Sequence, residues 1–173
     1  RVYASVHRFP KPTLAMIRGY CIGGGLNLAI CCDLRICSEN ARFALPAAKL
    51  GLGYGYAGLK RFVDAIGPAF TKEIFFSARQ FDSAEARAMG LVNRVLPDDQ
   101  LESYVREQAA TIAANAPLTV NSVKFIVGEA LKNEAERDLA RCAKLVQACF
   151  ASRDYVEGRT AFLEKRKPKF AGA

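Results

Sequence analysis

Short apolar runs alternate with glycines and charged residues over the first hundred residues of the chain. Each run is bounded by turn residues, which is typical of buried strands. The predicted strands are 13–19, 34–37, 41–44 and 92–96. Leu26–Cys32 contains no Pro or Gly and follows Gly23-Gly24-Gly25, so we expect a buried helix that begins at these glycines.

From about residue 59 the pattern changes to longer segments with helical periodicity. Leu59–Ile66 and Ala69–Phe76 are predicted helices separated by Gly67-Pro68. Ser83 is a candidate N-cap for a short helix that ends at Gly90.

Only helices are expected after Pro97, and the last two begin at Pro117 and near Glu134. In the second of these, apolar residues recur at three- and four-residue spacing and form one face: Leu139, Cys142, Val146, Cys149 and Phe150. Strands that alternate with helices, followed by helices alone, predict an α/β fold with a C-terminal helical region. We place the α/β core in residues 1–97 and the helical region in residues 98–173.

The composition and its distribution along the chain argue against a disordered protein and against a membrane-spanning one. The chain has 173 residues, 51% of them apolar, and 25 Lys and Arg against 17 Asp and Glu give a formal charge of +8. A chain this apolar is not disordered, and its length suits one domain. The uncharged run between Arg18 and Asp33 is too short, and too rich in glycine, for a membrane span. Because the chain begins at Arg1 rather than Met, we expect it to be the later part of a longer protein.

The six cysteines lie in apolar company without any C-x-x-C spacing, and His7 is the only histidine. This pattern favours buried, reduced thiols over a disulfide framework, and it predicts no metal site. We therefore expect a cytoplasmic protein that needs no metal.

The glycine run Gly23-Gly24-Gly25 is the most informative chemical feature. Bare amides at a helix start can approach a phosphate or an oxyanion, although a tight turn alone can also require glycines. No Lys-Ser or Lys-Thr follows, so the run is not a P-loop.

A second glycine cluster contains a formal G-x-G-x-x-G from Gly53 to Gly58. The segment before it contains Pro46 and no β-branched residue, so it lacks the strand that a dinucleotide fold requires. A mobile loop that presents Tyr54 and Tyr56 is the better interpretation.

Positive charge gathers at the C-terminus, where residues 159–173 carry five basic side chains against Glu164. The simplest interpretation is a solvated surface. A site for a phosphorylated small molecule, or a nucleic-acid-binding module, are the functional alternatives.

Residues 11–25, KPTLAMIRGYCIGGG, resemble the K-P-x-x-A-x-x-x-G-x-x-x-G-G-G signature of the enoyl-CoA hydratase/isomerase (crotonase) family. Further matches follow in family order. They are Cys32–Ile36, Ala41–Phe43 before Pro46, Leu50-Gly51, Ala84–Val92 and Glu157–Arg166. The resemblance implies a crotonase-like ββα spiral core, and it covers the chain without the family's opening third.

The resemblance also implies a reaction on an acyl-CoA thioester, with the Gly24 amide in the oxyanion hole of an enolate intermediate. The two family positions that hold glutamates in hydratases carry Asn27 and Ala47 here. Because neither can transfer a proton as a carboxylate does, we expect slow hydration. Asn27 can still orient a water molecule.

Tyr54 is the candidate to replace the two absent glutamates as a catalytic side chain. Its loop is similar to that of the methylmalonyl-CoA decarboxylase branch, in which a tyrosine lies in the active site, although Tyr54 can also simply pack. An acyl-CoA decarboxylase and a non-catalytic acyl-CoA binder are the alternatives to a hydratase or isomerase.

For coenzyme A, the resemblance implies contacts from Phe162 and Lys165. On one helix, residues at this spacing would share a face, and an ammonium suits a phosphate. The family also implies a homotrimer or a dimer of trimers, no nucleic-acid or membrane partner, and no cofactor, because coenzyme A is part of the substrate.

Overall fold

The computed structural model describes residues 2–173. The chain divides into two compact units. The first unit comprises the residues before Pro10 together with Thr13–Arg106, and the second comprises Pro10–Pro12 and Glu107–Ala173. Each unit is described by itself.

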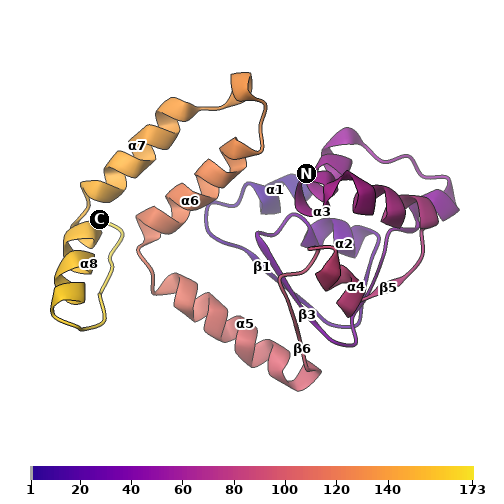
Figure 1. Cartoon of the computed structure of the whole chain (residues 1–173), viewed down its shortest axis with the longest axis horizontal. Helices are drawn as coiled ribbons and strands as arrows, with labels where there is room; N and C mark the ends of the chain where they lie inside the picture. Colours follow the sequence, from indigo (N-terminus) through magenta and orange to yellow (C-terminus); the bar gives the residue numbers. More distant parts are fainter. Residues whose placement is uncertain (1) are drawn as a thin grey trace. The chain divides into compact units, whose positions relative to one another are not determined.

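The first unit holds two small sheets (Figure 1). One sheet is fully parallel, in the order β1 (Leu14–Ile17), β3 (Leu34–Ser38) and β6 (Arg94–Leu96). In the other, β2 (Tyr20–Ile22) pairs with β4 (Arg42–Ala44) in parallel, and β4 pairs with β5 (Phe81–Asp82) in antiparallel. The predicted strands are confirmed. The three-residue β2 and the two-residue β5 were not predicted.

The helices of the first unit pack around these sheets. They are α1 (Val2–His7), α2 (Gly24–Ala29), the 3-10 helix η1 (Pro46–Leu50), α3 (Tyr56–Ser77), α4 (Ser83–Ala88) and the first part of α5 (Asp98–Ala113). Helix α3 has a break at Gly67, whose φ of 74° and ψ of 168° are not helical. The prediction of two helices separated by Gly67-Pro68 is thus confirmed.

The N-cap of α4 differs from the sequence prediction. Asp82, not Ser83, caps the helix, because its carboxylate accepts from the Glu85 amide at 2.9 Å. Glu85 closes a capping box by accepting from the Asp82 amide at 3.1 Å. The Ser83 hydroxyl instead donates to the Glu39 carbonyl at 2.7 Å, which ties the helix to the loop after β3.

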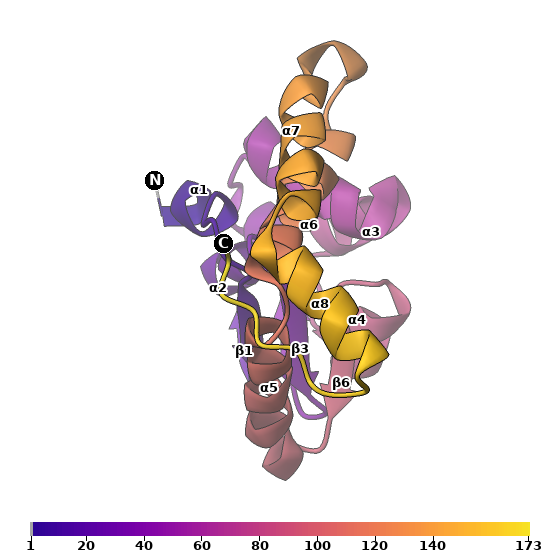
Figure 2. The same cartoon turned by 90° about the vertical axis from the view of Figure 1, so that its left-hand side faces the viewer.

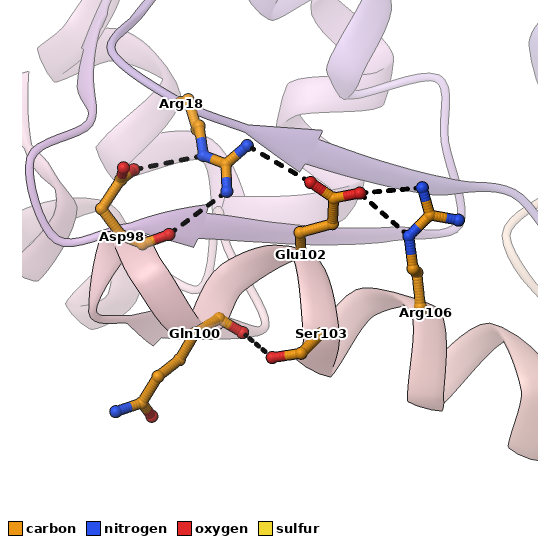
Figure 3. Close-up of polar contacts among 6 residues, drawn as sticks. All are labelled: Arg18, Asp98, Gln100, Glu102, Ser103 and Arg106. Carbon is orange, nitrogen blue, oxygen red and sulfur yellow. Dashed lines mark hydrogen bonds and ion pairs between the residues drawn. The ribbon is translucent and has the colours of Figure 1, made fainter.

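The boundary between the units falls inside α5, whereas the sequence analysis divides the chain after Pro97. Arg18, just after β1, explains why the first turns of α5 belong with the core. Its guanidinium contacts the Asp98 carboxylate at 3.3 Å and Glu102 at 3.9 Å, and Glu102 also pairs with Arg106 at 2.8 Å (Figure 3). Leu101, on the same turns, is fully buried.

The second unit is helical. After α5 come α6 (Pro117–Ala130), the 3-10 helix η2 (Glu134–Glu136), α7 (Leu139–Phe150) and α8 (Arg153–Leu163). Helix α6 packs against α7. The C-terminal segment returns along α8, where the Ala173 carbonyl accepts from the Arg153 amide at 2.7 Å (Figure 2).

Candidate functional site

A pocket of about 610 Å³ opens in the first unit beside the start of α2. Its walls come from the glycine turn before α2, from η1, and from the loop and first turns that begin α3. Gly24, Asn27, Ala47 and Tyr54 all line it. The residues that the sequence analysis drew from three separate segments therefore meet at one place.

The glycine turn leaves an amide free for the pocket. Gly23 has a φ of 56°, which explains why a glycine stands there, and its amide donates to the Ala44 carbonyl at 2.9 Å. Gly24 is the first residue of α2, so its amide has no acceptor within the helix. No other acceptor contacts the Gly24 amide among residues 2–173.

Asn27 contributes a hydrogen-bond acceptor to the pocket, whereas Gly24 contributes a donor. Its side chain is 8% exposed, and its Oδ1 atom has no hydrogen-bond partner in the part of the chain that the structure describes. A buried acceptor without a donor costs about 1–3 kcal/mol. A ligand or water molecule that carries a donor would remove this cost.

Tyr54 is half-buried against the same wall. Its ring packs edge-on against Phe75, with 4.8 Å between centroids. A Cβ on Gly58 would lie 2.9 Å from Cε1 of Tyr54, so only a glycine leaves room for this ring. Burial, and then the neighbouring Tyr3, raise the pKa of Tyr54, so the phenol is neutral near pH 7.

The loop around Tyr54 differs in part from the prediction. The 3-10 helix η1, rather than a strand, precedes Gly53, which confirms that the G-x-G-x-x-G lacks a dinucleotide-fold context. Tyr56 is not a loop residue: it begins α3, and its side chain is 81% exposed. Of the two tyrosines, only Tyr54 lines the pocket.

Two further pocket residues were missed by the sequence analysis. Tyr3, on α1, places its hydroxyl 3.4 Å from the position that a Cβ on Gly24 would occupy. Arg61, on α3, also lines the pocket. Helix α1 is too short for a periodic signal, and Arg61 lies in an amphipathic helix where a basic residue usually faces solvent.

Phe162 and Lys165 belong to the second unit. Phe162 is 83% exposed and lines a separate cavity of about 650 Å³ together with Phe170. The expectation that Lys165 shares a helix face with Phe162 is wrong, because α8 ends at Leu163. Lys165 has a φ of 54°, and its amide donates to the Phe162 carbonyl at 3.3 Å. With the Arg166 amide donating to the Ala161 carbonyl at 3.0 Å, this is a Schellman motif.

The basic C-terminal segment is partly neutralised. Arg166 contacts Glu157 through two hydrogen bonds of 2.6 and 2.9 Å, and it also pairs with Glu164 at 2.6 Å. The Arg159 guanidinium lies 5.6 Å from the centre of the Tyr155 ring. The segment is therefore ordered by its own acidic and aromatic neighbours.

The remaining sequence candidates are thiols. No disulfide joins the cysteines within residues 2–173; Cys21, Cys31 and Cys37 are buried, and the other three are partly buried. Burial raises the pKa of Cys21 and of Cys37 to about 11, so both are protonated thiols near pH 7. Within residues 2–173, no group of three His, Cys, Asp or Glu side chains is placed to hold a metal, and no helix is long and apolar enough to cross a membrane.

Comparison with known proteins gives consistent matches. A family model described as enoyl-CoA hydratase/isomerase matches residues 1–173. The chain is 35% identical over 170 residues to a crotonyl-CoA hydratase from Syntrophomonas wolfei, covering 98% of this chain and 65% of that protein. It is 36% identical over 166 residues to a mitochondrial Delta(3,5)-Delta(2,4)-dienoyl-CoA isomerase from Dictyostelium discoideum, covering 95% of this chain and 57% of that protein.

Solved structures of related proteins are also similar to this chain. An enoyl-CoA hydratase/carnithine racemase from Magnetospirillum magneticum superposes with a TM-score of 0.89 at 36% identity, over 99% of this chain and 63% of that one. The chain thus spans less than two thirds of the length of each of these three proteins. The likeness supports a crotonase-type fold, as the sequence resemblance implied.

Proposed function

The chain belongs to the enoyl-CoA hydratase/isomerase family, and from that premise we propose that its pocket binds an acyl-CoA thioester and stabilises the derived enolate. The Gly24 amide donates to the thioester oxygen. Because negative charge develops on that oxygen as the enolate forms, a donor fixed beforehand stabilises the transition state more than the substrate. The observation that carries this proposal is the free Gly24 amide on the pocket wall.

Hydration is not the reaction that the pocket suits best. No Asp, Glu or His is among the described residues that line it, and Asn27 and Ala47 stand at the positions of the family's two glutamates. Addition of water across a double bond needs a base for the water and an acid for the carbon. Moving a double bond likewise needs a base for the C2 proton, so an isomerase would need that group from outside this set of residues. We therefore place the activity in chemistry that passes through the enolate.

Decarboxylation is the second candidate, and the polar side chains of the pocket favour it. Loss of CO₂ breaks a carbon–carbon bond and leaves its electron pair in the enolate, so no base is required. The neutral Tyr54 phenol can then donate its proton to the enolate carbon and recover one from water. Arg61 is the charged side chain that the described pocket presents, and it suits an acyl group that carries a carboxylate.

The test is turnover of a panel of CoA esters: 2-enoyl, 3-enoyl and malonyl-type. Gly24→Pro removes the amide at a helix position that tolerates proline, whereas Gly24→Ala keeps the amide. We expect Gly24→Pro to lose about 100-fold in kcat and Gly24→Ala to lose much less. Equal activity of a folded Gly24→Pro variant would refute the role of Gly24. Binding of the panel without any turnover would favour a non-catalytic acyl-CoA binder.

For coenzyme A itself, we propose that Lys165 contacts the nucleotide phosphates and that the Phe162 ring packs on the coenzyme. Both residues are exposed. A homotrimer, or a dimer of trimers, is part of the same proposal. The exposed apolar side chains of α6, α7 and α8 support it: Val127, Leu139, Phe150, Val156 and Leu163.

A further inference from the structure

Arg61 is a half-buried arginine of α3 on the wall of the pocket. Within residues 2–173 its guanidinium forms no ion pair and no hydrogen bond. Asp64, one turn further along α3, does not serve it, because the Lys60 ammonium contacts both carboxylate oxygens of Asp64 at 2.7 and 2.8 Å. No Asp or Glu is among the described residues that line the pocket, so its charge is positive and uncompensated.

The other arginines of residues 2–173 that are not exposed all have partners. Arg35 donates to two backbone carbonyls at 2.6 and 2.7 Å, and Arg79 contacts two glutamates at 2.7 and 2.8 Å. A charged group that leaves water is costly unless it is paired and hydrogen-bonded. Arg61 therefore differs from Arg35 and Arg79 in a way that an anion bound in the pocket would remove.

Arg61 lies on the side of the pocket that the proposed function gives to the acyl group. Gly58, one turn earlier on the same face of α3, also lines the pocket. A Cβ on Gly58 would lie 2.9 Å from Cε1 of Tyr54 and 4.0 Å from Oδ1 of Asn27. This face of α3 thus meets the two side chains that the proposed function places beside the acyl carbons.

A contact with Cys31 gives the direction of the guanidinium. Burial raises the pKa of the Cys31 thiol, and the charge of Arg61 opposes this rise. Cys31 follows Asn27 by one helical turn, and its Sγ donates to the Asn27 carbonyl at 3.1 Å. The charge of Arg61 is therefore directed toward the end of α2, whereas the Gly24 amide is at its start.

An independent observation also points to a polar ligand beside Arg61. The Asn27 side chain is more than nine-tenths buried, lines the pocket and has an unpaired Oδ1 atom. A hydrocarbon acyl chain would leave both the Arg61 guanidinium and the Asn27 amide without partners. An acyl group that ends in a polar, negatively charged group would not.

We propose that Arg61 selects acyl-CoA esters whose acyl group carries a carboxylate, which its guanidinium binds through paired hydrogen bonds. This inference rests on the proposed function, because the thioester oxygen at the Gly24 amide sets where the acyl chain lies. It deepens that function by making the carboxylate the basis of substrate selection, whichever reaction of the enolate follows. Arg61 is then a specificity-determining residue.

The experiment compares the affinities of matched CoA esters: propionyl with malonyl, butyryl with succinyl, and pentanoyl with glutaryl. The members of a pair have equal numbers of acyl carbons and share coenzyme A, so their ratio isolates the carboxylate. Calorimetry gives Kd, and KM replaces it for any ester that turns over. We expect the wild type to prefer the carboxylated member of at least one pair by about 10-fold or more, as charge-assisted hydrogen bonds allow.

Arg61→Met keeps the length of the side chain and removes its charge. It should abolish this preference and change the affinity for the uncharged esters by less than about threefold. Arg61→Lys should retain part of the preference, because an ammonium keeps the charge but not the two-pronged geometry. Arg87→Met is the matched control, since Arg87 is an exposed arginine of α4 outside the pocket.

Three results would overturn the inference and leave the proposed function intact. They are equal affinity of the wild type within every pair, a preference that survives in Arg61→Met, and an equal loss for both members of each pair. The last result would assign Arg61 to coenzyme A rather than to the acyl group. A wild type that binds none of the six esters would overturn the proposed function as well.

Discussion

The two compact units are stabilised in different ways. Within residues 2–173, every buried hydrophobic side chain except Ala161 lies in the first unit. The buried side chains of the second unit are otherwise polar: Ser122, Glu129, Ser152 and Asp154. The first unit is therefore held by an apolar core, and the second by hydrogen bonds to its own backbone.

The polar contacts of the second unit fix the ends of its helices. The Asp154 carboxylate accepts from the Ala171 and Gly172 amides at 2.8 and 2.9 Å, which holds the C-terminal segment on α8. Glu129 accepts from the Asp138 amide at 2.9 Å, which closes the connection between α6 and α7. These contacts set the shape of the unit while leaving its apolar side chains uncovered.

This difference matches the roles proposed for the two units. An oxyanion donor must be held in place before the reaction, and the Gly24 amide of the proposal begins α2, whose Leu26 and Ala29 belong to the core of the first unit. The exposed apolar faces of the second unit suit contacts with coenzyme A and with other subunits. Buried apolar area thus marks the unit to which the proposed function assigns the chemistry, and exposed apolar side chains mark the unit to which it assigns contacts with coenzyme A and other subunits.

The largest expected effect comes from breaking the apolar core. Phe43 is fully buried and stacks on Phe81 with 5.6 Å between ring centroids. Phe43→Ala should lower the free energy of unfolding by about 3–5 kcal/mol, through lost burial and the cavity left behind. Phe162→Ala, at an 83% exposed position, should change it by less than about 0.5 kcal/mol. Urea unfolding of both variants measures the difference, and equal losses would contradict the comparison.

The second unit should respond most to loss of a buried carboxylate. Asp154→Ala leaves the Ala171 and Gly172 amides without their acceptor, and we expect a loss of about 2 kcal/mol. Hydrogen exchange should show faster exchange at these two amides and along α8, with no change in the strands. Asp99→Ala, at an exposed position on α5, is the control. Protection that is unchanged at residues 171 and 172 would contradict the role of Asp154.

Local signals in the sequence were enough to predict most of the strands and helices of the first unit. Glycine turns and apolar runs located the β1, β3, β4 and β6 strands, and Gly67-Pro68 located the break in α3. The family motif brought Gly24, Asn27 and Tyr54 forward, and the structure gathers them in one pocket. Tyr3 escaped prediction because its distance from Gly24 depends on how α1 packs on α2, which no local pattern encodes.

The end of α8 is a second place where the sequence analysis was wrong. The expectation that Phe162 and Lys165 share a helix came from the family resemblance, and the structure ends α8 at Leu163. The Schellman bonds and the αL conformation of Lys165 end it, and a lysine is not the residue that usually signals this cap. A site prediction based on shared helix faces fails wherever the helix stops early.

Lys165 offers a smaller effect that sharpens the comparison. Glycine adopts a φ of 54° without the steric cost that a Cβ brings, so Lys165→Gly should stabilise the second unit by about 1 kcal/mol. If Lys165 contacts phosphate, the same variant should bind acyl-CoA more weakly and bind the acyl-pantetheine, which lacks the nucleotide, with unchanged affinity. Lys165→Ala should lose the same binding without the gain in stability. Equal changes for both ligands would refute the phosphate contact.

The smallest effect concerns an ion pair at the surface of the second unit. Hydrogen bonds from Arg166 and from the Lys169 amide lower the pKa of Glu157 to about 2 from an ordinary value of about 4.5. Because the folded state has the lower pKa, the contribution of Glu157 to stability is present above pH 4.5. It is lost as the pH falls from there toward 2.

The wild type should therefore be more stable than Glu157→Gln at pH 7, and this difference should shrink at pH 3. Urea midpoints of the two proteins measure it, with the exposed Glu136→Gln as the control. A difference that is the same at both pH values would show that Glu157 acts through its shape rather than its charge.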